Sequence, residues 1–367
     1  MADWRRTALV VGQAIEERFD ALRFRLKRRF GLLAPFEILP YRGHGTTREL
    51  FLKGRALEES GITRAGRDDT VWKNIRNMAR RFASDEVAGA RVRASFEGLQ
   101  VETTADVEGF FEVHFELPEP LDGEAGWYKV ELDLLSPPSP GGGSVRSTGQ
   151  VLVPHGASFG VISDLDDTVV RSSATNVLKM AWIVVRNNAH TRLPFEGVAA
   201  FYRALQLGTD GRSSNPIFYV SSSPWNIYDM LEDFLNVHGV PPGPLFLKDW
   251  SLTVLGKHRD YKIGMIRRLL STYEDLPFVL IGDSGEEDPE IYLQAVREHA
   301  GRIRAVYIRD VTSGERDAEI MAMADEVRKL GTEMAAVPDT ATAAEHAASI
   351  GLIAPDAIAA VRSESAG

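Results

Sequence analysis

The sequence contains no cysteine in its 367 residues. A disulfide framework, a thiolate nucleophile and a cysteine metal site are therefore all excluded. No run of apolar residues reaches the roughly 18 to 20 that a membrane-spanning helix needs, so we predict no transmembrane segment. The apolar run at 8–12 is too short for the core of a secretory leader, and we expect a cytoplasmic protein.

An excess of positive charge is missing as well. The formal net charge is −10, whereas proteins that bind nucleic acid are usually basic, so we expect no nucleic-acid partner. Hydrophobic residues make up 44% and charged residues 26% of the chain, which are ordinary proportions for a globular protein and argue against wholesale disorder. The length is sufficient for two domains.

Residues 1–34 differ from the rest of the chain in charge. Their first 33 positions hold eight Lys/Arg and four Asp/Glu residues, a local net charge of +4. Leu22, Leu26, Phe30 and Leu33 recur at helical spacing, which predicts a basic amphipathic helix. Two interpretations stay open. The helix packs its apolar stripe on the body of the protein, or it lies peripherally on the anionic inner surface of a membrane.

Residues 35–154 are predicted to form a small, mostly-β domain. In the segment 111–117 every second residue is apolar, while Glu112, His114 and Glu116 alternate with them, as in a half-buried antiparallel strand. Similar short runs separated by turn residues indicate a sandwich-like arrangement. A helix is expected at 71–82, and the Pro/Gly-rich stretch 136–144 is predicted to be a loop.

Residues 155–367 have a different pattern. Continuous apolar runs of about four residues alternate with helix-like stretches, which indicates strands buried on both faces and therefore a parallel sheet covered by helices. We predict a doubly wound, Rossmann-like α/β domain. The predicted strands lie at 159–162, 217–220, 245–247, 278–281, 305–308 and 334–337.

Acidic and hydroxyl side chains follow three of these strands where each strand ends. Asp164 and Asp166 follow the first, Ser221 follows the second, and Asp283 and Asp288 follow a third. In an open α/β sheet, ligands bind beyond the carboxyl ends of the strands. A cluster of carboxylates there would repel itself without a cation, and hard oxygen ligands suit Mg²⁺. The predicted metal ligands are Asp164, Asp166, Asp283 and Asp288.

Two of these carboxylates have the chemistry of phosphoryl transfer. Asp164 at a strand end is suited to nucleophilic attack, which gives a covalent aspartyl-phosphate. Asp166, two residues on, points to the same face if the backbone stays extended, and it can protonate the leaving oxygen and later activate water.

The remaining site residues are expected to hold the phosphoryl oxygens. Ser221 and the backbone N–H group of Ser222 are placed for this at the start of a predicted helix. Lys262 opens another helix-like segment and supplies a cation that can hold both phosphate and Asp164. Lys257 is the alternative for this lysine, and the choice stays open.

The combination of motifs resembles the haloacid dehalogenase (HAD) superfamily of phosphatases. The residues that carry the resemblance are Asp164-x-Asp166-x-Thr168, Ser221, Lys262 and Gly282-Asp283-x4-Asp288. Further stretches are similar to the catalytic domain of the fungal actin-patch phosphatidate phosphatases and their bacterial homologues. These stretches are 161–168, 218–225, 282–292 and 306–311, with 40–45 and 54–57 similar to the leading part of the bacterial members.

The resemblance implies a Mg²⁺-dependent phosphoric monoester hydrolase that acts through an aspartyl-phosphate. Phosphatidate is the expected substrate, with diacylglycerol and phosphate as products, and the family places the enzyme in lipid metabolism. Two alternatives stay open: a HAD phosphatase of a soluble phosphomonoester or phosphoprotein, and a non-catalytic scaffold with a vestigial HAD domain. Intact residues at all motif positions argue against the scaffold.

Overall fold

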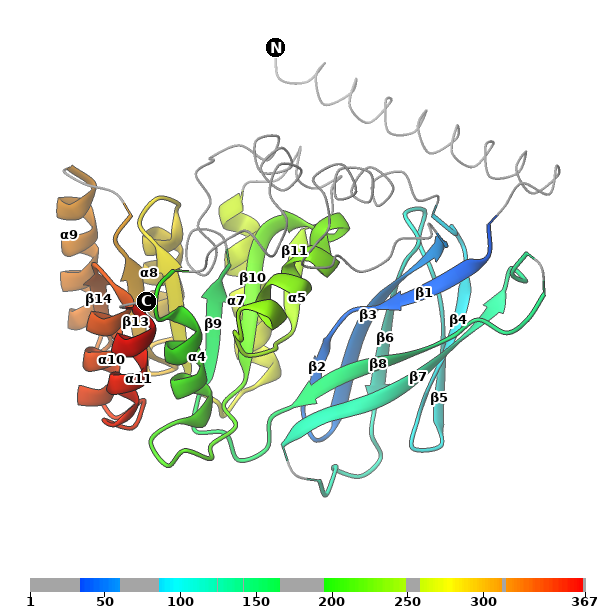
Figure 1. The fold of residues 1–367 in the computed structure, drawn as a ribbon, viewed down its shortest axis with the longest axis horizontal. Coiled ribbons are helices and arrows are strands. Elements are labelled where there is room, and N and C mark those ends of the chain that lie inside the picture. The colour runs from blue at the N-terminus through cyan, green and yellow to red at the C-terminus, as the bar shows by residue number, and fades with distance from the viewer. Residues whose placement is uncertain are drawn as a thin grey trace, which may run out of the picture.

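The computed structural model describes residues 34–59, 86–123, 125–140, 142–165, 195–248, 258–311 and 315–365. The predicted helix at 1–34, except for its last residue, and the predicted helix at 71–82 lie outside the described residues, as do Asp166, Thr168 and Lys257. Two sheets, side by side, organise the rest (Figure 1). None of the described helices is long and apolar enough to cross a membrane.

The first sheet confirms the prediction of a mostly-β part. Its eight strands join into a single sheet in the order β1-β3-β2-β8-β7-β4-β5, with β6 paired to β3. Every pairing is antiparallel except that of β2 with β8. The strands are β1 (Phe36–Pro40), β2 (Gly43–Gly45), β3 (Glu49–Glu58), β4 (Arg91–Phe96), β5 (Leu99–Thr104), β6 (Phe110–Glu116), β7 (Gly126–Ser136) and β8 (Arg146–Val153).

The alternating residues of this sheet enclose a core of their own. In β6, Phe111, Val113 and Phe115 are buried while the residues between them are exposed, as the period of two predicts. Phe96 of β4 and Val130 of β7 belong to the same cluster. The division of the chain at 34/35 and 154/155 stays a prediction.

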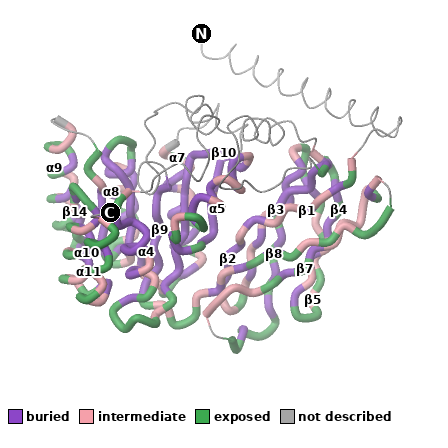
Figure 2. Tube along the Cα trace, viewed as in Figure 1, coloured by how far each residue is buried: buried purple, intermediate pink, exposed green. Residues whose placement is uncertain are grey.

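The second sheet confirms the predicted doubly wound α/β fold. Six parallel strands lie in the order β11-β10-β9-β12-β13-β14, which is the 3-2-1-4-5-6 arrangement of Rossmann-like sheets. The strands are β9 (Gly160–Asp164), β10 (Ile217–Pro224), β11 (Leu245–Lys248), β12 (Phe278–Asp283), β13 (Ile303–Arg309) and β14 (Glu333–Val337). The central strands β9 and β10 are buried along their length (Figure 2), and so is β12. In β6, by contrast, buried and exposed residues alternate.

Helices cover both faces of the parallel sheet, which explains why its strands are continuously apolar. One core cluster holds α4 (Val198–Leu207), α5 (Tyr228–Val237), α10 (Thr340–Ser349) and α11 (Ala357–Ser365) against the sheet. The cluster on the other face contains residues of α7 (His258–Thr272), α8 (Asp288–Glu298) and α9 (Glu315–Lys329). The strand order reverses between β9 and β12, so the carboxyl ends of these two strands border the crevice where such folds bind ligands.

The segment 40–45, singled out by its resemblance to bacterial homologues, joins the two sheets. The ring of Tyr41 lies 4.5 Å from those of Trp225 and Tyr228 across the junction. The ring of His44 lies 5.3 Å from Phe246 and 6.1 Å from Tyr273. The short strand β2 therefore contributes an imidazole to an aromatic contact between the sheets.

His44 makes stability depend on pH. Burial, and after it the positive charge of Arg268, lowers the pKa of His44 to about 3, against 6.5 for an ordinary histidine. Between pH 3 and pH 6.5, His44 is protonated in the unfolded chain but neutral in the folded protein. The free energy of unfolding therefore decreases as the pH falls below 6.5. From pH 8 to pH 5 we expect His44 to account for a loss of about 2 kcal/mol.

Urea unfolding at both pH values checks this prediction. His44→Gln removes the titrating group, so the pH-dependent loss in this variant should be smaller by that amount. His155→Gln, at an exposed histidine, should behave as the unmodified protein does. Equal losses in the unmodified protein and in His44→Gln would contradict the assignment.

Candidate active site

The site begins at the carboxyl ends of β9 and β12, next to each other in the sheet. Ser163 is in register with Ile281, so Asp164 and Asp283 end neighbouring strands at one edge. Ile162 packs against the cluster that contains α7 and α8. Because strand side chains alternate, Asp164 faces the same side as Ile162. A buried carboxylate thus points toward two helices.

Lys262 and Asp288 come from those helices. Lys262 lies in the first turns of α7, and its Nζ is 2.8 Å from an oxygen of each of Asp164, Glu286 and Asp288. Lys262, Asp164 and Asp288 are almost fully buried, whereas the side chain of Glu286 is 43% exposed. The Lys262 ammonium group therefore contacts three carboxylates, of which that of Glu286 is partly exposed to solvent.

Lys262 stays charged in this environment. Burial by itself lowers its pKa, but the negative charges of Asp164, Asp288 and Glu286 outweigh burial and hold the pKa well above the usual value. The Lys262 cation in turn stabilises the ionised forms of the carboxylates around it.

Asp283 completes a triad of buried carboxylates with Asp164 and Asp288. One oxygen from each of the three lies within 4.8 Å of the others. Burial, followed by repulsion from Asp288 and Glu286, raises the pKa of Asp283 to about 7. The Asp283 Oδ2 atom is buried and has no hydrogen-bond partner among the described residues. Three hard oxygen donors and a buried acceptor of this kind fit a divalent cation such as Mg²⁺.

The other Asp283 oxygen shapes the loop that follows. Asp283 Oδ1 accepts hydrogen bonds from the backbone N–H groups of Gly285 (2.7 Å) and Glu286 (3.1 Å). Asp288 Oδ2 accepts from the N–H of Asp283 at 3.3 Å, at the N-terminal end of α8, where a negative charge is favoured. The acidic loop 284–287 is thus folded around the carboxylates that it connects.

Gly282 is required for this arrangement. A Cβ atom at position 282 would lie 2.3 Å from Asp288 Oδ2 and 2.8 Å from Asp288 Cγ. The Asp288 side chain therefore occupies the space that a side chain at 282 would fill. In the pair at the end of β12, Gly282 therefore leaves room for the Asp288 side chain and Asp283 supplies a carboxylate to the triad.

The predicted phosphate-binding serines lie at the end of β10, on the other side of β9. Val220 is in register with Asp164, so Ser221 follows one residue beyond it. Ser221 Oγ accepts a hydrogen bond from the N–H of Ser223 at 2.9 Å, within the last residues of β10. Ser222 Oγ is buried and has no hydrogen-bond partner among the described residues. The structure therefore offers a hydroxyl at 222 where the sequence predicted only a backbone group.

Of the predicted site residues, Asp164, Asp283, Asp288 and Lys262 are brought together, and Ser221 and Ser222 lie on the strand next to Asp164. Asp166 and the alternative Lys257 are outside the described part of the chain. Sequence reasoning gave Glu286 no role, although it lies inside a quoted motif. It missed Arg316 entirely, because nothing in the local pattern of α9 distinguishes this residue from other surface arginines.

Arg316 holds the acidic loop from outside. Its guanidinium donates hydrogen bonds to the carbonyl oxygens of Ser284 (3.3 Å) and Glu286 (3.0 Å). The same group binds both carboxylate oxygens of Glu290 at 2.6 and 2.9 Å. The loop between Asp283 and Asp288 is thereby tied to α8 and α9.

Comparison with known proteins supports the resemblance to phosphatidate phosphatases that the motifs predict. Residues 159–310 match the family model described as the catalytic domain of phosphatidate phosphatase APP1, so the predicted resemblance is confirmed. Phosphatidate phosphatase APP1 of Saccharomyces cerevisiae is 31% identical over 168 residues, which are 45% of this chain and 27% of that protein. An uncharacterised protein of Schizosaccharomyces pombe is 24% identical over 272 residues, 72% of this chain and 41% of that protein.

The chain thus spans less than half the length of these curated relatives. Among solved structures, a HAD-family hydrolase of Deinococcus radiodurans with bound phosphate and sodium aligns with a TM-score of 0.32 and 18% identity, over 54% of this chain and 99% of that one. A carbohydrate acetylesterase of Xanthomonas citri aligns with a TM-score of 0.28 and 13% identity, over 88% of this chain and 71% of that one.

Gly282→Ala should displace the Asp288 carboxylate. We expect a loss of about 1 to 3 kcal/mol in the free energy of unfolding from overpacking, together with weaker Mg²⁺ binding by calorimetric titration. Gly264→Ala on α7 is the matched control, because a Cβ at 264 meets nothing within 4 Å. The control should leave Mg²⁺ binding unchanged. A Gly282→Ala variant that is as stable as the unmodified protein and binds Mg²⁺ as tightly would contradict the steric argument.

Arg316→Ala should free the acidic loop and weaken Mg²⁺ binding by about tenfold, the usual effect of removing a group that orients metal ligands. Arg297→Ala is the control, since Arg297 also links α8 to α9, through Glu326 at 2.6 Å, but lies away from the loop. Calorimetric titration with Mg²⁺ separates the two variants. Equal affinity in both would show that Arg316 contributes only to packing.

Proposed function

We propose that this chain is a Mg²⁺-dependent phosphatase that hydrolyses a phosphomonoester, with phosphatidate as its substrate and an aspartyl-phosphate as its intermediate. One observation carries the proposal: Lys262 Nζ lies 2.8 Å from Asp164 and Asp288 at the point where the strand order reverses, beside Asp283. The names of the matched family and of the yeast relative support phosphatidate as the substrate.

In the proposed first step, an oxygen of Asp164 attacks the phosphorus atom and the ester P–O bond breaks. Asp166, placed two residues on by the sequence, protonates the leaving alkoxide. Lys262 fixes the orientation of Asp164 and attracts the phosphoryl oxygens, and Ser221 and Ser222 hold these oxygens from the neighbouring strand. The leaving group is an alcohol, which for phosphatidate is diacylglycerol.

In the second step, water attacks the aspartyl-phosphate and releases inorganic phosphate. Asp166, now ionised, takes the proton from this water, which returns both aspartates to their starting forms. The same carboxyl group therefore acts as acid and then as base.

The residues that would hold Mg²⁺ are Asp164, Asp283 and Asp288 from the buried triad, with Asp166 added from the sequence. When bound, the cation would neutralise negative charge on the phosphoryl group and on the carboxylates. Lys262 alone brings a single positive charge to at least three carboxylates, so the local excess of negative charge favours a second cation there.

The proposal of phosphatidate as substrate implies that the protein works at a membrane surface. A cytoplasmic protein that contacts an anionic membrane peripherally, through the predicted basic helix 1–34, would meet a lipid substrate at the surface. Liposome co-sedimentation with and without residues 1–33 tests this part separately from the chemistry.

Asp164→Asn should abolish the reaction, because an amide is not a nucleophile here. We expect phosphate release from an aryl phosphate to fall by about a thousandfold or more. Asp260→Asn is the matched control, an exposed aspartate on the same helix as Lys262. Removal of divalent metal with a chelator should also stop release, and added Mg²⁺ should restore it. Full activity in Asp164→Asn would rule out the proposed nucleophile.

The substrate is tested with dioctanoyl phosphatidate, lysophosphatidate, sugar phosphates and phosphopeptides at equal concentrations. Phosphatidate should give the highest kcat/KM. A higher value for a sugar phosphate or a phosphopeptide would keep the chemistry and replace the substrate with a soluble one.

A further inference from the structure

Three carboxylate oxygens surround the ammonium group of Lys262. Lys262 Nζ donates hydrogen bonds to Glu286 Oε2 and to Asp288 Oδ1, both at 2.8 Å, and Asp164 Oδ1 lies at the same distance. An ammonium group has three N–H donors, so these three oxygens match its full capacity. A phosphoryl oxygen that accepts a hydrogen bond from Lys262 must therefore replace one of the three carboxylates.

Two of the carboxylates are held in place. The side chain of Asp164 is 1% exposed and that of Asp288 is fully buried. Asp288 Oδ2 also accepts a hydrogen bond from the N–H of Asp283 at 3.3 Å, in the space that Gly282 leaves open. Moving either carboxylate away from Lys262 would leave a buried negative charge without its cation, which is strongly unfavourable. Neither of them is a candidate for exchange.

Glu286 is the carboxylate that can leave. Its side chain is 43% exposed, so the charge passes directly into water when it leaves Lys262. Its backbone is fixed on both sides, because its N–H donates to Asp283 Oδ1 at 3.1 Å and its carbonyl oxygen accepts from Arg316 at 3.0 Å. Rotation of the Glu286 side chain is therefore sufficient, and the acidic loop keeps its fold.

Charge favours the exchange. A carboxylate carries one negative charge, whereas a phosphate monoester is largely a dianion above about pH 6. Both groups offer an oxygen for a charge-assisted hydrogen bond from the same ammonium group. Like charges repel at this distance, so the Glu286 carboxylate and a phosphoryl group are not both stable beside Lys262.

We propose that Glu286 occupies the position of a phosphoryl oxygen on Lys262, that the substrate displaces it, and that its return promotes release of inorganic phosphate. Glu286 then sets how tightly the site holds substrate and product, without touching the reacting atoms. The inference rests on the proposed function in one respect, which is that Lys262 binds the phosphoryl group.

Glu286→Gln tests the proposal, because a neutral amide competes less well for the ammonium group. Calorimetric titration of the full chain with inorganic phosphate, at saturating Mg²⁺, should show binding that is tighter by about fivefold, the strength of a half-exposed ion pair. With an aryl phosphate, KM should fall by a similar factor while kcat does not rise. A variant that only damaged the structure would not bind phosphate more tightly.

Glu287→Gln is the matched control. It removes the same charge from the next residue of the loop, which is exposed and is not one of the three carboxylates at Lys262. Its affinity for phosphate should stay within about twofold of that of the unmodified protein, because water and salt screen exposed charges. Equal tightening in both variants would assign the effect to the charge of the loop and would overturn the proposed exchange.

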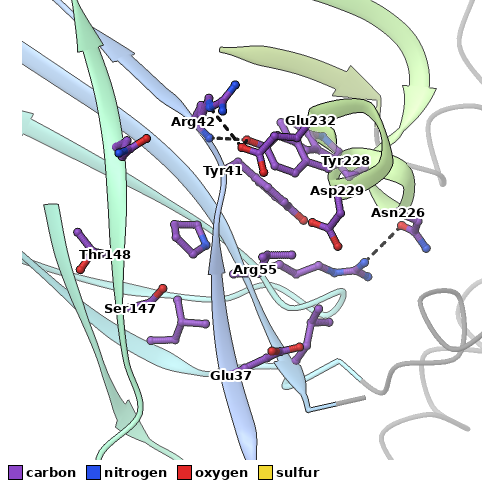
Figure 3. Close-up of a pocket in the computed structure, with 16 residues that line it drawn as sticks. Glu37, Tyr41, Arg42, Arg55, Ser147, Thr148, Asn226, Tyr228, Asp229 and Glu232 are labelled. Carbon is purple, nitrogen blue, oxygen red and sulfur yellow. Dashed lines mark hydrogen bonds and ion pairs between the residues drawn. The ribbon is translucent and has the colours of Figure 1, made fainter. Parts of the chain in front are cut away.

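Glu232→Gln controls for the loss of an ion pair in itself. Glu232 lies 3.2 Å from Arg42 Nε, and both residues line a cavity of about 550 Å³ beside Tyr41 at the junction of the two sheets (Figure 3). Glu232 belongs to α5, which packs on the opposite face of the parallel sheet from α7 and Lys262. This variant should bind phosphate as the unmodified protein does.

The outcomes separate this inference from the proposed function. Unchanged or weaker phosphate binding in Glu286→Gln, in a protein that hydrolyses the aryl phosphate, would overturn the role of Glu286 and leave the phosphatase intact. No binding and no hydrolysis in any variant would overturn both. Glu286→Ala is the second variant, expected to behave as Glu286→Gln does, and circular dichroism checks that each variant folds.

Discussion

The contacts of the Lys262 ammonium group with three carboxylates are the interaction on which the rest of the site depends. Asp164 and Asp288 are buried, and an unpaired buried carboxylate is strongly unfavourable. Losing one partner of a buried ion pair typically costs about 3 to 5 kcal/mol, so this lysine allows the strand ends to keep ionised groups out of water. Its position in the first turns of α7 brings the cation to the sheet edge.

The topology of the parallel sheet explains why the charges gather at this place. The strand order reverses between β9 and β12, and in sheets of this kind the carboxyl ends of two such strands border the crevice that binds ligands. The carboxylates and the lysine of the site come from two strands, a loop and two helices. Gly282 leaves room for the carboxylate of Asp288, and Arg316 fixes the loop between them. Each of these supports comes from a different element.

The mostly-β part is joined to the α/β part by rings and charges. Tyr41 and His44 insert aromatic groups between the sheets, and Arg55 binds Asn226, two residues beyond the end of β10. The stretch that carries Ser221 and Ser222 thus continues directly into the surface on which the first sheet rests. A structural change at this junction is therefore only a few residues along the chain from the serines that we propose bind phosphate.

The order of residues along the chain was enough to predict the parallel sheet and to point to acidic residues that gather at its edge. Continuous apolar runs specified a parallel sheet, because burial on both faces leaves no polar alternation, and the acids that follow the strands pointed to Asp164 and Asp283. Motif order singled out Lys262 without deciding against Lys257. These features are local, so they can be read within one element and its ends.

Which groups meet one another follows from the folded arrangement instead. Glu286 and Arg316 joined the site because a loop and a distant helix pack beside β12, and no periodicity within α9 encodes that contact. The steric need for Gly282, the joining role of Tyr41 and the cavity beside it likewise depend on elements far apart in the chain. Contacts of this kind arise from strand order and helix packing, which a pattern within one segment does not contain.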